Sequence, residues 1–123
     1  MQNKKDDFYY ATSIIENIDF VLSHTTGLSL EDLSANEVLI DSVMFRFIQI
    51  AENSQNLSSD FKEKHSNLPW HQINGIRNRI VHAYSIVRVD IIYETLKNDL
   101  KPFRDELKMI TDQLTNNQMQ ENA

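Results

Sequence analysis

The stretch PWHQINGIRNRIVHAY, residues 69–84, combines a helical pattern with an unusual set of polar groups. Proline is favoured at the first position of a helix, so we expect a helix to start at Pro69. The apolar side chains that follow recur every three or four residues, which is typical of an amphipathic helix. They are Trp70, Ile73, Ile76, Ile80, Val81 and Tyr84.

The polar groups of this predicted helix are unevenly placed. Arg77 falls inside the apolar face, while Asn78 and His82 lie four residues apart on its flank. An unpaired buried charge is costly, so Arg77 must meet a carboxylate, a phosphate or a subunit boundary. Glu52 is the candidate within the chain. From periodicity alone, a structural Arg77–Glu52 pair is the favoured interpretation.

The same helical periodicity extends to both sides of this stretch. Amphipathic helices are expected over residues 7–24 and 36–57, and Ser29 is expected to cap a short helical turn. A further helix should begin at Asp90 and should be kinked or restarted by Pro102. The pattern indicates a series of helices with short connections.

Glycine and proline are scarce, with two of each among 123 residues. β-Sandwiches and barrels need turn glycines, so this composition favours helices. We predict an all-α fold, an antiparallel bundle of four to five helices. A single helical domain is expected over residues 1–115, followed by a polar C-terminal tail over residues 116–123.

The composition also excludes several kinds of site. The chain has no cysteine, which rules out disulfides, iron–sulfur clusters and thiolate zinc sites. It lacks a His-Glu-x-x-His pattern and a glycine-rich phosphate loop, so no metal and no cofactor are expected. No apolar stretch approaches the roughly 20 residues that span a bilayer. We therefore expect a cytoplasmic protein without a membrane partner.

Charge is distributed unevenly along a chain whose net charge is −6. The window from Lys64 to Val89 contains four cationic side chains and no Asp or Glu. By itself, one cationic window on an acidic protein fits a local anion site or chance clustering equally well, and it disfavours a general DNA-binding face. The cations are Lys64, Arg77, Arg79 and Arg88.

Together these residues resemble a known signature. Its core is an Arg-Asn pair, three further residues, then histidine, any residue and tyrosine. The chain matches it with Arg77-Asn78, His82 and Tyr84, preceded by Trp70 and Gly75. This pattern resembles the HepT-like proteins of the HEPN superfamily, and the resemblance extends from about residue 7 to residue 107.

The resemblance implies an activity and a partner. Members of the family are typically ribonuclease toxins of toxin–antitoxin pairs. It implies that the bundle is HEPN-like, that Arg77, Asn78 and His82 are catalytic, and that RNA is the substrate. It also implies a minimal nucleotidyltransferase (MntA-like) antitoxin, which can silence the toxin by transferring AMP to Tyr84.

The expected chemistry fits these residue types. RNA can be cleaved without a metal when the 2′-hydroxyl attacks its own phosphate, which requires a base, an acid and positive charge. His82 could serve as acid or base, Arg77 as a charged fork for phosphate oxygens, and Asn78 as a donor or as an orienting group for His82. One motif supplies a single histidine for two proton transfers, so we expect a homodimer.

The remaining polar and small residues receive weaker assignments. Arg79 and Arg88 are expected at the surface, where they could contact RNA. Trp70 is expected in the core, and Gly75 is expected to let another helix approach closely. An alternative function is a non-catalytic helical module that binds a nucleotide or a nucleotidyltransferase partner. Replacement of His82 by alanine distinguishes the two functions.

Overall fold

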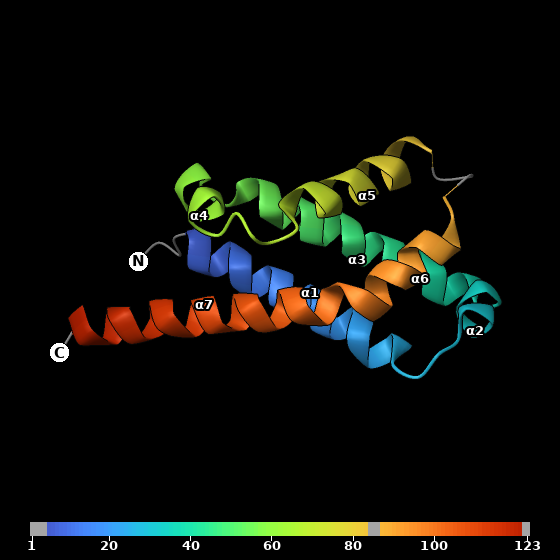
Figure 1. Ribbon diagram of the computed structural model, residues 1–123, viewed down its shortest axis with the longest axis horizontal. Coiled ribbons are helices and arrows are strands. Elements are labelled where there is room, and N and C mark those ends of the chain that lie inside the picture. Colours follow the sequence, from blue (N-terminus) through green and yellow to red (C-terminus); the bar gives the residue numbers. More distant parts are fainter. Residues whose placement is uncertain (1–4, 84–86, 122–123) are drawn as a thin grey trace.

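The computed structural model describes residues 5–83 and 87–121, and these ranges consist of helices and short connections (Figure 1). The predicted all-α class is confirmed. In chain order the helices are α1 (Asp7–Thr25), α2 (Leu30–Ser34), α3 (Glu37–Asn56), α4 (Ser59–Lys64), α5 (Trp70–His82), α6 (Val89–Asn98) and α7 (Leu100–Glu121).

Local capping explains where several of these helices begin. The side chain of Asn36 accepts a hydrogen bond from the backbone N–H of Leu39, and that of Ser58 accepts one from Phe61. Ser29 and Asp32 form a reciprocal capping box at α2. Such bonds satisfy N–H groups that have no partner inside the helix. The helix starts predicted at Ser29 and Asn36 are therefore confirmed, whereas capping by Ser58 was not predicted.

The start of α6 differs from the prediction. Arg88 is its N-cap residue, and Asp90, which we expected to be the cap, lies in its first turn. There the carboxylate of Asp90 accepts two hydrogen bonds from the Arg88 guanidinium. An acidic group in the first turn also interacts favourably with the helix dipole, so Asp90 supports the helix without capping it.

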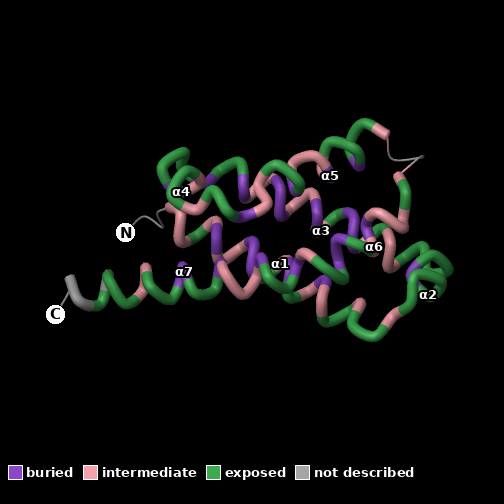
Figure 2. Tube along the Cα trace, in the orientation of Figure 1, coloured by how far each residue is buried: buried purple, intermediate pink, exposed green. Residues whose placement is uncertain are grey.

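The core lies where α1, α3 and α7 face one another. α1 packs against both α3 and α7, and α3 also packs against α5. Buried residues follow the inward edges of these helices in Figure 2. Burying one large apolar side chain contributes roughly 1.5–3 kcal/mol relative to leaving it exposed. The largest fully buried side chains include Phe47, Phe103, Ile14, Ile18, Ile50 and Leu107.

The last helix is longer than predicted. α7 continues to Glu121, so most of the residues assigned to a polar tail over 116–123 are helical. Polar composition does not end a helix, and the sequence has no glycine or proline after Pro102. The helix is interrupted between α6 and α7. Pro102 then falls in the first turn of α7, where no backbone N–H is needed.

Candidate functional site

Two polar contacts join α5 to α3. The Gln55 Nε2 group donates to Asn74 Oδ1 at 2.8 Å. The Nε and Nη2 atoms of Arg77 lie 3.1 Å and 3.0 Å from Glu52 Oε1. Residue numbers rise along α5 as they fall along α3, so the two helices run antiparallel here. The Arg77–Glu52 pair predicted from the sequence is present.

Arg77 has a second partner on its own helix. Its Nη1 atom donates to Asn78 Oδ1 at 3.1 Å. A guanidinium carries five N–H donors, and these contacts engage only one hydrogen on each of its three nitrogens. Glu52 and Asn78 therefore hold the guanidinium from two sides. The side chain is 26% exposed, and its remaining N–H groups can donate to an anion. The Asn78 amide N–H group also remains a donor, because its oxygen is occupied by Arg77.

His82 is the last residue of α5 and is exposed. It makes no hydrogen bond or ion pair with any of the described residues, and none joins it to Asn78. Asn78 nevertheless lies one turn earlier on the same exposed face. The structure therefore brings Arg77, Asn78 and Glu52 together and leaves the imidazole of His82 open on an adjoining part of the surface.

Tyr84 lies in residues 84–86, outside the described residues, so its predicted role stays a prediction. The two other predicted RNA contacts are exposed but differ in their partners. Arg88 is engaged by Asp90, and its guanidinium lowers the pKa of that carboxyl below the ordinary value. Arg79 makes no hydrogen bond or ion pair within residues 5–83 and 87–121. Arg79 is therefore the more available cation.

Gly75 does not behave as predicted within this chain. A Cβ atom placed on it would meet nothing within 4 Å, so none of the other helices in the described ranges approaches it closely. At about 100° per residue, Gly75 falls on the face that carries Asn78 and His82 and not on the face packed against α3. The glycine leaves bare backbone beside the candidate catalytic side chains.

Two residues of the predicted apolar face are less buried than expected. Val81 is 45% exposed, although it lies on the side of α5 that carries Asn74 and Arg77. Trp70 is half-buried: its Nε1 group donates to the His65 carbonyl at 3.0 Å, and its ring meets that of Phe103 edge-on. The indole N–H needs a polar partner, which keeps one side of the ring near the surface.

Sequence reasoning missed the Gln55–Asn74 hydrogen bond. Its signal was present in the spacing, because Gln55 follows Glu52 by three residues and Asn74 precedes Arg77 by three. Each therefore lies one turn from a member of the ion pair, on the same side of its helix. Within the described part of the chain, no group of three or more His, Asp or Glu side chains is placed to hold a metal ion.

Comparison with known proteins identifies a matching family model and several related proteins. The family model "Ribonuclease HepT-like" matches residues 14–110, which include Glu52 and all of α5. A candidate RNase of Caldanaerobacter subterraneus subsp. tengcongensis is 32% identical over 101 residues, 82% of this chain and 90% of that protein. A candidate ribonuclease HepT of Thermococcus cleftensis is 27% identical, over 82% of this chain and 92% of that protein. No solved structure matches the chain.

A relative with two named activities is matched only in part. It is a gamma-glutamylcyclotransferase and candidate RNase of Methanocaldococcus jannaschii, 27% identical over 114 residues. The match takes in 93% of this chain but 51% of that protein. In the described ranges of this chain, no helix combines the length and the hydropathy needed to cross a membrane.

Proposed function

Because the chain belongs to the HepT-like ribonuclease family, we propose that it is an endoribonuclease that cleaves RNA without a metal ion. The observation that carries this proposal is the arrangement on α5. The same helix carries a guanidinium oriented by Glu52 and Asn78 and, on an adjoining part of its surface, the exposed imidazole of His82, which has no partner among the described residues. Cation and imidazole are the two groups that phosphate transesterification requires.

The proposed reaction is an attack of the RNA 2′-hydroxyl on the adjacent phosphorus. The O2′–P bond forms and the P–O5′ bond breaks, which leaves a 2′,3′-cyclic phosphate and a 5′-hydroxyl. One His82 accepts the proton of the 2′-hydroxyl, and a second returns a proton to the departing O5′ atom. Arg77 and the Asn78 amide stabilise the charge that develops on the phosphate oxygens.

Two histidines imply two copies of the chain, and we place the dimer contact on the faces of α3 and α5. Val38, Phe45 and Glu52 are spaced by seven residues and so share one side of α3. Val38 and Phe45 are 78% and 54% exposed, and Val81 on α5 is 45% exposed. A two-fold dimer would cover these apolar groups and bring the two α5 helices together. The variant Phe45→Glu should then be monomeric in light scattering and inactive.

The proposal includes regulation by a partner. Family membership supports a toxin of a toxin–antitoxin pair, with a minimal nucleotidyltransferase as antitoxin. Transfer of AMP to Tyr84 would add bulk and negative charge next to His82, where an RNA phosphate must bind. The Tyr84→Phe variant should remain active in the presence of the partner and ATP, whereas wild type should be silenced.

A second candidate function rests on the Arg77–Glu52 ion pair. This pair alone could serve to brace α5 against α3 in a non-catalytic module that binds a nucleotide or a partner. In that case neither His82 nor the free donors of Arg77 would affect any reaction.

Cleavage of labelled RNA by purified protein in EDTA separates the two functions. We expect discrete products from wild type and a loss of roughly 100-fold or more for His82→Ala. His71→Ala is the matched control, because His71 is an exposed histidine of the same helix outside the signature. Equal cleavage by wild type and His82→Ala would contradict the proposed site, and a requirement for added Mg²⁺ would contradict the metal-free reaction.

A further inference from the structure

A cavity of about 360 Å³ opens between the C-terminal turn of α5 and the start of α6. This volume lies at the small end of the roughly 300–1,000 Å³ typical of ligand sites. Its floor is aliphatic, and its two charged lining groups are the arginines Arg79 and Arg88. The apolar lining residues are Ile76, Ala83, Val87, Ile91 and Ile92.

The charges at this cavity favour an anionic ligand. No carboxylate is among its lining residues, although the chain as a whole carries a net charge of −6. Arg88 already binds Asp90, whereas Arg79 has no hydrogen-bond or ion-pair partner among the described residues. A ligand with a flat apolar part and an adjacent negative charge would fill the floor and meet Arg79. A nucleotide has this combination.

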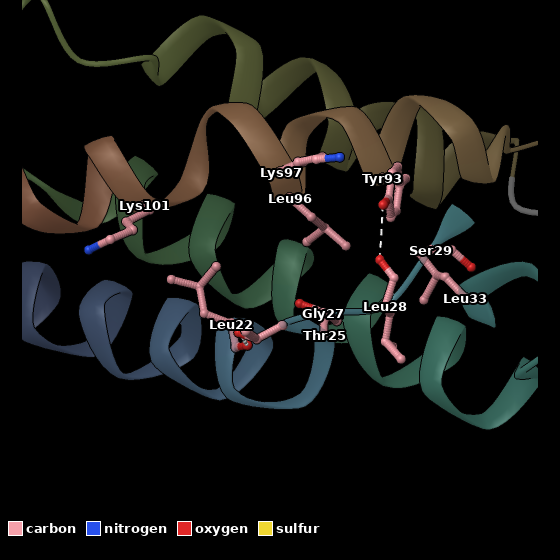
Figure 3. A pocket seen from close by; sticks show the side chains of 11 residues that line it. Leu22, Thr25, Gly27, Leu28, Ser29, Leu33, Tyr93, Leu96, Lys97 and Lys101 are labelled. Carbon is pink, nitrogen blue, oxygen red and sulfur yellow. Dashed lines mark hydrogen bonds between the residues drawn. The ribbon is translucent and has the colours of Figure 1, made fainter. Parts of the chain in front are cut away.

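A larger cavity elsewhere provides a contrast (Figure 3). It measures about 490 Å³ and lies between the end of α1 and α6. Several of its polar groups are already bound within the chain: the Tyr93 hydroxyl donates to the Leu28 carbonyl at 2.9 Å, and that of Thr25 donates to Val21. The ammonium group of Lys101 pairs with Asp105 at 3.1 Å. Its remaining cation, Lys97, lies with its ammonium over the Tyr93 ring, 5.8 Å from the ring centroid, and this cavity does not adjoin α5.

The smaller cavity also adjoins the proposed catalytic face. Arg79 precedes His82 by three residues and Ala83 follows it directly. At about 100° per residue, the exposed face with His82 lies between the Arg77 side of α5 and the cavity side. A phosphate held between Arg77 and His82 therefore has Arg79 and the cavity as its next neighbours around the helix.

From this geometry we propose that the cavity binds the nucleobase next to the scissile phosphate, with Arg79 contacting the neighbouring phosphate. This subsite rests on the proposed ribonuclease function and adds a substrate preference to it. The aliphatic floor offers contact area and no hydrogen-bond acceptor, so the larger bases gain more. The site prefers a purine to a pyrimidine at one position beside the cleaved bond.

Binding can be tested without cleavage by using the His82→Ala variant. The probes are AMP, UMP and inorganic phosphate, and the readout is the NMR signals of the isoleucine methyl groups. AMP should shift the methyl signals of Ile76, Ile91 and Ile92 and should bind more tightly than UMP, while phosphate should leave those signals in place. Shifts that are equal for AMP and phosphate would overturn the base subsite.

Four further variants, each made in the His82→Ala protein, locate the effect. Ile91→Trp fills the cavity and should weaken AMP binding at least tenfold, whereas Leu30→Trp, an exposed position on α2, should not. Arg79→Gln should weaken AMP binding more than Arg88→Gln, because Arg88 is already engaged by Asp90. The two arginine variants keep the test decisive should Ile91→Trp fail to fold. Equal AMP affinity in all four variants would refute the proposal.

Cleavage of a randomised RNA separates this proposal from the ribonuclease function. Wild type should prefer a purine at one fixed position, and the Ile91→Trp variant should lose that preference. If AMP shifts the methyl signals but wild type does not cleave RNA, the ribonuclease function is refuted and base binding in the cavity is supported. Cleavage without base preference and without methyl shifts would support the ribonuclease function and refute the base subsite. Methyl shifts that follow protein concentration alone would assign the cavity to a second copy of the chain and overturn the subsite.

Discussion

Among the residues that the structure describes, two arginine–carboxylate pairs join one helix to another, and one of these pairs lies in the candidate site. Arg77 joins α5 to Glu52 of α3, and Arg104 joins α7 to Asp19 of α1. The two arginine side chains are almost equally accessible, 26% and 29% exposed. Exposure and the presence of an ion pair therefore do not distinguish the site from the scaffold.

The neighbours of each guanidinium differ. Arg104 meets both oxygens of Asp19, at 2.8 Å and 3.3 Å, and also contacts Asp105. The bond to Asp19 raises the pKa of Arg104, and two carboxylates there would repel a phosphate. Arg77 meets one oxygen of Glu52, and its other partner is the neutral amide of Asn78. The local balance of charge, and not the pair itself, makes Arg77 suitable for an anion.

The strongest way to test this comparison is to remove each arginine in turn. Arg77→Ala should lower the cleavage rate roughly 100-fold or more, since it removes charge from the transition state. Arg104→Ala should leave the rate unchanged and lower the free energy of unfolding by about 1 kcal/mol or less. Initial rates and urea unfolding measure the two effects. Equal losses of activity would show that both arginines act through the fold.

Changing the carboxylates should have a smaller effect and should reveal positioning. Glu52→Gln keeps one hydrogen-bond acceptor for Arg77 but removes a charge that competes with the RNA phosphate. We expect kcat to fall about tenfold, equivalent to about 1.4 kcal/mol, while KM falls as well. Asp19→Asn, the matched control at Arg104, should change neither constant. A rise in KM with unchanged kcat for Glu52→Gln would contradict positioning of Arg77 by Glu52.

Gly75 allows the exposed face of α5 to be tested without changing any charged side chain, and Gly27 provides a control. Gly75→Ala meets open space in a helix, so it should raise the free energy of unfolding by roughly 0.5–1 kcal/mol. Gly27→Ala should lower it, because the φ of Gly27 is +81°. If RNA or a second copy approaches the bare backbone, Gly75→Ala should also reduce cleavage. Greater stability with full activity would show that nothing approaches closely there.

The smallest expected effect is the contribution of Asp105, a neighbour of Arg104, to stability in acid. Hydrogen bonds from Lys101 and Arg104 lower the pKa of Asp105 below its ordinary value of 3.8. Its contribution to stability is therefore fully present above pH 3.8 and is lost as the pH falls through the lowered value. Wild type should have a slightly higher Tm than Asp105→Asn at pH 5, and the difference should vanish towards pH 2. A constant difference would mean that the ionisation of Asp105 does not stabilise the fold.

Much of this architecture could be predicted from the sequence because its causes are local. Ser29 and Asn36 mark helix starts through bonds to N–H groups three residues away. Apolar spacing identifies the buried faces for the same reason, since a helix returns to one side every three or four residues. The Arg77–Glu52 pair was also predictable, because a charge inside an apolar stripe restricts its partner to few residues.

Only the tertiary structure decided what lies around that pair. The pair of Arg88 with Asp90 is local, because the two residues are two apart, but only the structure shows that no carboxylate among the described residues comes to Arg79. The open space beside Gly75 and the cavity between α5 and α6 were likewise not predicted. Local hydrogen bonds and periodicity determine which residues form helices. Which face stays open depends on how segments distant in the sequence pack, and no short-range pattern records that packing.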